Sequence, residues 1–100
     1  MKIIAITACP TGIAHTYMAA ESLEGAGKKL GHDIKVETQG AMGIENELTA
    51  ADIQGAQVLI IASEIKVQGR DRFLGVPRVL EVPVQLAIRN PAEIFNRLTP

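Results

Sequence analysis

The sequence predicts an α/β fold in a single domain spanning residues 1–100, and three features of the chain predict it. Two short segments, 3–8 and 57–62, are almost continuously apolar, as strands covered on both faces are. A longer segment, about residues 14–30, has helical periodicity. A chain of 100 residues has room for one hydrophobic core, so these elements are expected to pack together.

The first strand is predicted at residues 3–8, where β-branched side chains are frequent, and it is expected to be central in the sheet. Residues 9–12 interrupt the apolar run. Beyond them apolar residues recur three to five positions apart, at Ala14, Met18, Ala19, Leu23, Ala26 and Leu30. This spacing predicts a helix that ends before Gly31.

Residues 33–38 alternate between apolar side chains and the charged Lys35 and Glu37, which predicts a strand with one side facing solvent. Such a strand is expected at a sheet edge. Residues 39–43 contain two glycines and predict a loop.

In the second half, Thr49 followed three residues later by Asp52 predicts the N-cap of a short helix. A second buried strand is predicted at residues 57–62. The segment 63–77 mixes charges with glycine and proline, and predicts irregular or short helical structure.

Residues 78–82 predict a last short strand, and Pro83 suits a helix start. Residues 90–93 combine a cap, a proline at the first helical position and an acid at the third. They predict that a helix restarts there and continues to Leu98.

Strands that alternate with helices predict a small parallel sheet of about four strands with helices on both faces, a Rossmann-like three-layer sandwich. Ligand sites in such sheets lie beyond the carboxyl ends of the strands. That rule points to the turn after the first strand, which contains Cys9.

Composition excludes several classes of function. A net charge of −1 gives no basic footprint for nucleic acid. The longest apolar runs fall far short of the ~20 residues of a membrane span, so no direct membrane insertion is expected. The first residues lack a secretory signal, which predicts a cytoplasmic location. Cys9 is the only cysteine, so no internal disulfide can form.

The turn after the first strand has the pattern of a phosphate-binding loop at a helix N-terminus, where free N–H groups and the helix dipole favour an anion. Its predicted members are Pro10, Thr11, Gly12, Ile13, Ala14, His15 and Thr16. The same field stabilises a thiolate, so Cys9 is predicted to be a nucleophile that attacks phosphorus. No cofactor is expected. A metal site is not expected either, because His15 has no second histidine or carboxylate at ligand spacing.

The same residues allow three alternatives to a phosphate site. Cys9 could simply be a small buried hydrophobic residue. A cysteine-dependent phosphatase would need an arginine at the sixth position after the cysteine, and that position is His15. Dinucleotide binding would need more than the single glycine of this turn. His15 either bonds the phosphate or thiolate or serves as a cap or packing residue.

Two segments resemble a known family. Residues 8–20 resemble its phosphorylation-site signature. Its second signature is resembled by residues 36–40 together with Gly43, Glu45, Asn46, Leu48 and Thr49. The family is the fructose/mannitol-type enzyme IIB components of the phosphoenolpyruvate-dependent sugar phosphotransferase system (PTS). The resemblance covers nearly the whole chain, as a single fructose-like (type 2) IIB domain.

The resemblance implies that Cys9 forms a phosphocysteine intermediate. The phosphoryl group comes from a phosphohistidine of enzyme IIA and passes to a sugar bound by the membrane component IIC, so both are expected partners. Gln39 and Gly40 are a candidate partner or site loop, whereas Arg70, Asp71 and Arg72 are interpreted as solvated charges. A phosphatase-like hydrolase and a non-catalytic regulatory module remain the alternative functions.

Overall fold

The chain folds into alternating strands and helices in this computed structural model, which describes residues 1–9 and 13–98. The strands are β1 (Lys2–Ala8), β2 (Asp33–Gly40), β3 (Gly43–Glu45), β4 (Val58–Ser63) and β5 (Arg78–Val82). The helices are α1 (Ile13–Lys29), α2 (Ala50–Gln54), α3 (Val84–Arg89) and α4 (Pro91–Asn96), with a short 3-10 helix, η1 (Arg70–Phe73).

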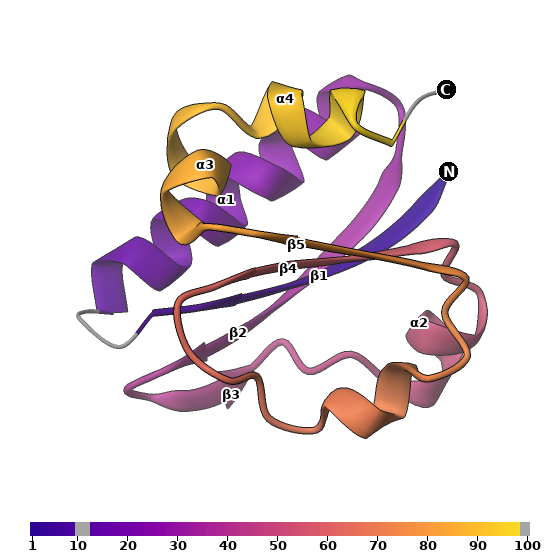
Figure 1. The fold of residues 1–100 in the computed structure, drawn as a ribbon, viewed down its shortest axis with the longest axis horizontal. Coiled ribbons are helices and arrows are strands. Elements are labelled where there is room, and N and C mark those ends of the chain that lie inside the picture. Colours follow the sequence, from indigo (N-terminus) through magenta and orange to yellow (C-terminus); the bar gives the residue numbers. More distant parts are fainter. Residues whose placement is uncertain (10–12, 99–100) are drawn as a thin grey trace.

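The strands form a five-stranded sheet in the order β3-β2-β1-β4-β5 (Figure 1). Strand β1 is central and pairs in parallel with both β2 and β4, as predicted. Ala8 lies opposite Gln39 on one side and Ser63 on the other, so three strand ends meet at one edge of the sheet. The predicted α/β class is therefore confirmed, with one strand more than the four expected.

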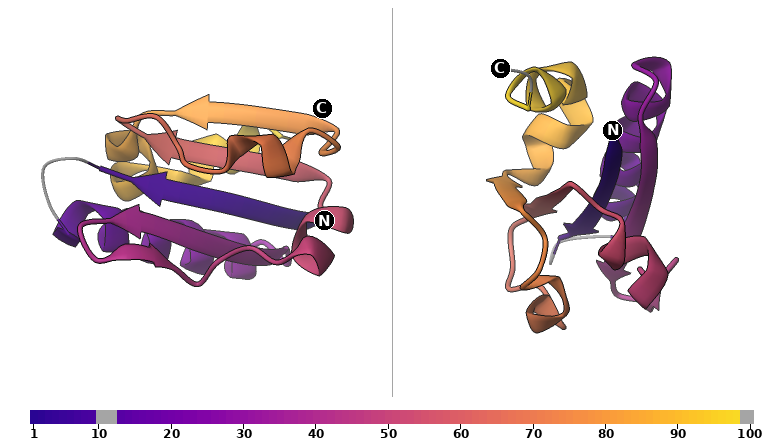
Figure 2. Two further views of the ribbon diagram at one scale, coloured as in Figure 1. Left: turned by 90° about the horizontal axis from the view of Figure 1, so that it is seen from below. Right: turned by 90° about the vertical axis from the view of Figure 1, so that its right-hand side faces the viewer.

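Two layers cover the sheet, as the three-layer prediction requires. Helices α1, α3 and α4 lie on one face, and α2 and η1 with their connecting loops lie on the other (Figures 1 and 2). Alternate side chains of β1 enter the two resulting cores. Ile3 and Ala5 pack towards α1, and Ile4 and Ile6 pack towards the opposite layer.

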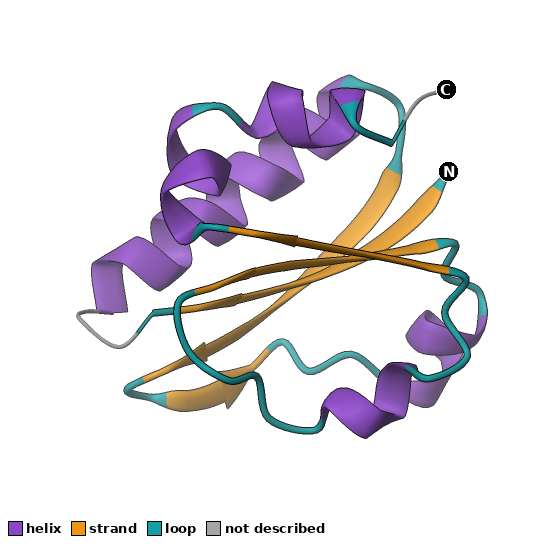
Figure 3. Cartoon of the chain, in the orientation of Figure 1, coloured by secondary structure: helices purple, strands orange, loops and turns teal. Residues whose placement is uncertain are grey.

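The prediction for residues 39–43 was wrong, because the loop is a tight hairpin. Strand β2 runs on to Gly40 and β3 returns antiparallel to it (Figure 3). Gly43 has φ +89°, a conformation that glycine adopts without strain. Strand β3 has only three residues, too few to give a period-two signal, so β2 was wrongly placed at the sheet edge.

The solvent-facing side predicted for residues 33–38 was also wrong at Glu37, whose side chain is fully buried. The layer that contains η1 covers it, and Arg72 forms an ion pair with it at 3.0 Å. The interpretation of Arg72 as a solvated charge was therefore wrong. Arg70, by contrast, is exposed and pairs with exposed Glu81.

Predicted helix starts agree with the structure. Thr49 and Asp52 form a reciprocal capping box at α2. Pro83 precedes α3, and Pro91 occupies the first turn of α4, which ends at Asn96, earlier than expected. Within residues 1–9 and 13–98, none of the helices has the length and apolarity needed to cross a membrane.

Candidate active site

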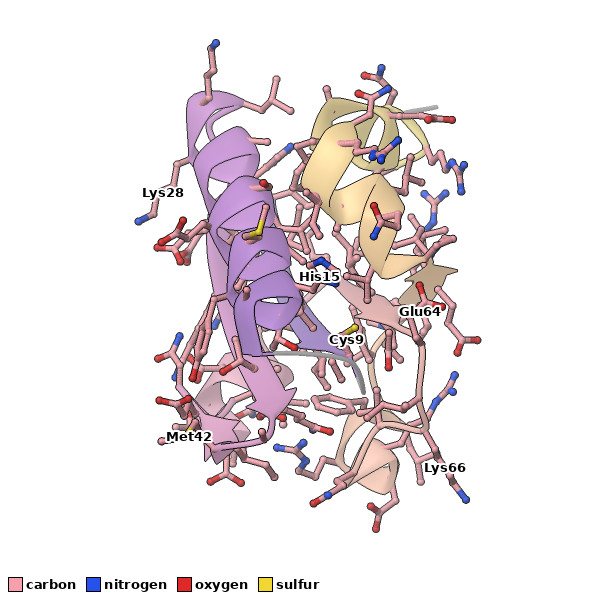
Figure 4. All side chains as sticks on the ribbon, turned by 90° about the vertical axis from the view of Figure 1, so that its left-hand side faces the viewer. Cys9, His15, Lys28, Met42, Glu64 and Lys66 are labelled. Carbon is pink, nitrogen blue, oxygen red and sulfur yellow. The ribbon has the colours of Figure 1, made fainter. Side chains whose placement is uncertain are left out.

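Cys9 directly follows β1 at the edge of the sheet where the parallel strands end. Its side chain belongs to the core on the α1 side, with Ile3 and Ala5, and only 7% of its surface is exposed. Figure 4 looks onto this edge and shows Cys9 near its centre, between α1 and the segment that contains Glu64. The sulfur therefore lies where the strand-end rule predicts a site.

His15, in the first turn of α1, is close to the cysteine. The distance between Cys9 Sγ and His15 Nδ1 is 4.0 Å, within reach of a weak hydrogen bond to sulfur. His15 as a whole is an exposed residue. A ring nitrogen here can donate to a thiolate or accept from a thiol, depending on the tautomer. The role of His15 in binding phosphate stays a prediction.

Thr16 is 1% exposed and ties the start of α1 to the sheet, because its carbonyl accepts a hydrogen bond from Thr7 Oγ1 at 3.0 Å. Its own Oγ1 is buried and bonds no other part of the chain that the structure describes. Leaving a buried hydroxyl unsatisfied costs about 1–3 kcal/mol. A phosphate oxygen bound at this helix end would satisfy it.

Gly40 lies beside this turn from the β2 side. A Cβ on Gly40 would lie 3.7 Å from Thr16 Oγ1, an ordinary contact distance. Of the other predicted loop members, Pro10, Thr11 and Gly12 lie outside the described residues, Ile13 begins α1 and Ala14 is exposed. Their part in phosphate binding stays a prediction.

Gln39 points away from Cys9. Along β2, Ile34 and Val36 face the α1 core, whereas Gln39 follows the register of Glu37 on the opposite face. The Gln39 side chain is 6% exposed and bonds to Gln68 and Glu37 rather than facing the candidate site.

Glu64 is a neighbour of the site that the sequence interpretation did not single out. Its N–H donates to the Ala8 carbonyl at 3.2 Å, and its Oε1 accepts from the Val84 N–H, at the start of α3, at 3.1 Å. Its position directly after a buried strand was the available signal, because the strand-end rule applies to β4 as well as to β1.

Within residues 1–9 and 13–98, there is no cluster of three or more His, Cys, Asp or Glu side chains that could hold a metal ion. The candidate chemistry at this edge is that of a thiol beside an imidazole and a helix N-terminus.

Solved structures show the same fold. An enzyme IIB subunit of the PTS from Escherichia coli K12 superposes with TM-score 0.89 at 44% identity, over 97% of this chain and 89% of that one. A fructose-specific IIABC domain from Borrelia burgdorferi gives TM-score 0.89 at 46% identity, covering 95% and 89%. An arsenate reductase shares the fold alone, with TM-score 0.55 at 12% identity.

Sequence comparisons agree with the structural ones. The family model described as "PTS system, Lactose/Cellobiose specific IIB subunit" matches residues 4–97. The fructose-like EIIB component 2 of Escherichia coli K12 is 46% identical over 97 residues, covering 97% of this chain and 91% of that protein. The fructose-specific EIIABC component of Bacillus subtilis is 51% identical over 96% of this chain, which spans 15% of its length. The chain therefore belongs to the PTS IIB family, and its relatives include fructose-like EIIB components.

Proposed function

We propose that this domain relays a phosphoryl group through Cys9, taking it from a phosphohistidine of enzyme IIA and passing it to a sugar bound by the membrane component IIC. The observation that carries the proposal is the position of the Cys9 sulfur, at the end of the central strand, just before a 17-residue helix and 4.0 Å from His15 Nδ1. Membership of the PTS IIB family supports it.

The chemistry consists of two displacements at phosphorus. In the first, the Cys9 thiolate attacks the phosphohistidine; an S–P bond forms, the N–P bond breaks and the leaving imidazole takes up a proton. In the second, a sugar hydroxyl attacks; an O–P bond forms, the S–P bond breaks, the thiolate leaves and the hydroxyl proton is released. Cys9 is regenerated and no net oxidation occurs.

The first turn of α1 suits a dianion. No acidic side chain lies there, and the helix dipole adds partial positive charge at this end. Backbone N–H groups and the buried Thr16 hydroxyl can donate hydrogen bonds to the phosphoryl oxygens, on which negative charge develops. Positioning and these donors supply the catalysis, since a thiolate needs no general base.

Transfer is favoured over hydrolysis because the sixth position after the cysteine is His15, whereas a cysteine-dependent phosphatase places an arginine there. Without a guanidinium to hold the phosphoryl group for water attack, the phosphocysteine is expected to persist until an acceptor arrives. The hydrolase reading predicts Cys9-dependent turnover of an aryl phosphate instead.

The sugar cannot be inferred from the sequence identity between this domain and its relatives. A Bacillus subtilis relative named as fructose-specific is 51% identical, and an Escherichia coli relative named as 2-O-alpha-mannosyl-D-glycerate-specific is 53% identical. Similar identity to proteins of different named specificity fits a phosphoryl carrier that contacts proteins and leaves sugar selection to the membrane component.

The decisive experiment is intact-mass analysis after incubation with phosphoenolpyruvate, enzyme I, the carrier protein HPr and a fructose-type IIA. One added phosphoryl group is expected on the wild type and none on Cys9→Ser. The outcome against the proposal is an unmodified wild type in the presence of demonstrably phosphorylated IIA, which would favour the regulatory-module alternative.

A further inference from the structure

A short segment crosses the end of β1 next to Ala8, the residue that precedes Cys9. We call residues 64–68 the strap; it begins where β4 ends and finishes beside β2. Because β4 and β2 flank β1, the strap has to cross the end of β1 to reach from one to the other. Val67 packs into the core opposite α1, so the crossing runs on the face away from that helix.

The strap is fastened on both sides of Ala8. At its start, the Glu64 N–H donates to the Ala8 carbonyl at 3.2 Å. At its end, the Gln68 N–H donates to Gln39 Oε1 at 2.8 Å, and Gln39 Nε2 donates to the Gln68 carbonyl at 3.1 Å. Gln39 is the register neighbour of Ala8 on β2, so it holds the strap as another strand would.

The orientation of the Gln39 amide is set by a buried ion pair. Its Nε2 also donates to Glu37 Oε2 at 2.7 Å, which leaves Oε1 facing Gln68. Arg72 binds both oxygens of Glu37 at 3.0 Å, and the Leu48 N–H donates to Oε1 at 2.8 Å. A carboxylate with these four donors fixes which end of the amide faces the strap.

The same arginine holds the chain just beyond the strap. Arg72 Nε donates to the Gly69 carbonyl at 2.8 Å, and Nη2 donates to the Gln68 carbonyl at 3.2 Å. Burial opposes the charge of Glu37, but the hydrogen bonds from Arg72, Leu48 and Gln39 outweigh it and lower the pKa of Glu37. The pair therefore stays ionised at neutral pH.

We infer that Gln39 is a positioning residue for phosphoryl transfer: it closes the strap under the end of β1, and the Glu37–Arg72 pair fixes its orientation. The inference rests on the proposed relay through Cys9. Gln39 acts through the strap and Ala8 and does not touch the phosphoryl group, because its side chain is buried on the face opposite Cys9. Misplacement of a reacting atom by about 1 Å costs roughly 10²-fold in rate, so support at Ala8 matters.

The test is Gln39→Met, which keeps the side-chain length and removes both hydrogen bonds to Gln68 together with the one to Glu37. We expect kcat for phosphorylation of Cys9 by phosphorylated IIA to fall about tenfold with little change in KM. Amide hydrogen exchange across residues 64–68 and alkylation of Cys9 by iodoacetamide should both accelerate. Gln54→Met, the same change at an exposed position on α2, is the matched control. It should leave kcat, amide exchange and Cys9 alkylation unchanged.

Gln39→Glu separates positioning from general loss of structure. A second carboxylate 2.7 Å from Glu37 Oε2 is repelled when ionised. Its protonated form can again accept from the Gln68 N–H and donate one hydrogen bond to Glu37, although the amide donates two. The transfer rate of this variant relative to the wild type should therefore rise as the pH falls from 8 to 6. The same ratio for Gln39→Met should stay flat.

Unchanged exchange and unchanged kcat in Gln39→Met would overturn the inference. A higher KM at constant kcat would also overturn it, since that result assigns the strap to donor docking. Exchange and alkylation need no partner protein, so they decide whether Gln39 closes the strap and holds Cys9 in place even if the wild type accepts no phosphoryl group. A wild type that accepts none would contradict the proposed function, and these two measurements keep that failure distinct from a failure of Gln39 to hold the strap.

Discussion

At the scale of single residues, the pairing of Glu37 with Arg72 has the largest consequence for stability. Glu37 is fully buried and Arg72 is 24% exposed on its side chain. Removing one partner of such a pair leaves an uncompensated charge in the interior, which is far more costly than removing both.

Arg72→Met should therefore lower the free energy of unfolding by about 3–5 kcal/mol at pH 7. Glu37→Gln combined with Arg72→Met removes the buried charge and keeps an acceptor for the Leu48 N–H, so it should recover at least about 1 kcal/mol of that loss. Urea unfolding of the three proteins measures both quantities. A double variant less stable than Arg72→Met would show that the buried charge is not the cause.

The position of Cys9 at the end of the central strand could be predicted from the sequence, because a buried strand, a glycine-containing segment and a helix follow one another along the chain. The burial of Gln39 and the ion pair of Arg72 could not be predicted in this way. The period-two pattern of β2 places Glu37 and Gln39 on the side of Lys35, and no local signal says that residues 46–77 return to cover that side. The pairing depends on contacts across 35 positions of the chain.

At the scale of elements, α1 contains two glycines whose surroundings differ. A Cβ added to Gly25 meets nothing within 4 Å, whereas one added to Gly27 would lie 2.9 Å from Ile34 Cγ2 and 3.3 Å from Phe95 Cζ. Gly27 therefore marks the place where α1 packs tightly on β2 and α4.

Gly25→Ala should raise the free energy of unfolding by about 0.5–1 kcal/mol through helix propensity. Gly27→Ala has the same intrinsic gain, but crowding a branched, buried side chain costs about 1–3 kcal/mol, so a net loss is expected. Thermal unfolding of the two variants is the measurement. If Gly27→Ala proved as stable as Gly25→Ala, the packing of α1 against Ile34 would have to be looser than described.

The capping box of α2 gives a second test at this scale. Hydrogen bonds from Lys35 and Thr49 lower the pKa of Asp52 to about 2, below the ~3.9 of an unfolded chain. Its stabilising effect is therefore complete above about pH 4 and is lost as the pH falls towards 2. Asp52→Asn should cost about 1 kcal/mol at pH 7, and the difference from wild type should shrink as the pH falls towards 2 and be lost below it.

Denaturant unfolding at several pH values measures this effect. Glu24→Gln, which disrupts the exposed Glu24–Lys28 pair of α1, is the control and should stay within a few tenths of a kcal/mol throughout. A difference for Asp52→Asn that stays as large at pH 2 as at pH 7 would assign its stabilising effect to packing rather than to charge.

Most elements could be predicted because their signals are local. The capping box, the first-turn proline of α4 and the two buried strands each fit within a few residues. Strand β3 could not, because three exposed residues carry no pattern, and its position depends on the hairpin and on a bond from the Tyr17 hydroxyl to Glu45. For this reason the sequence predicted about four strands, whereas the sheet has five.

At the scale of the whole molecule, the two layers differ in how they are held. The layer with α1, α3 and α4 packs through aliphatic side chains and Phe95. The opposite layer adds two carboxylates to a smaller apolar core, with Glu37 bonded to Arg72 and Asp52 bonded to Lys35. Because hydrogen bonds lower the pKa of both carboxyl groups, this second layer depends on their ionised forms.

Acid should consequently loosen the second layer first. Both carboxyl groups have folded-state pKa values below those of the unfolded chain, so their stabilisation is present above about pH 4.3 and declines as the pH falls. Pepsin at pH 3 should cut first within residues 46–57 or 64–77, with α1 cut later. Glu37→Gln should be cut there more readily than the wild type at pH 5, and the difference should shrink as the pH falls, because acid protonates the wild-type side chain. A first cut in α1 would show that the aliphatic layer is the weaker one.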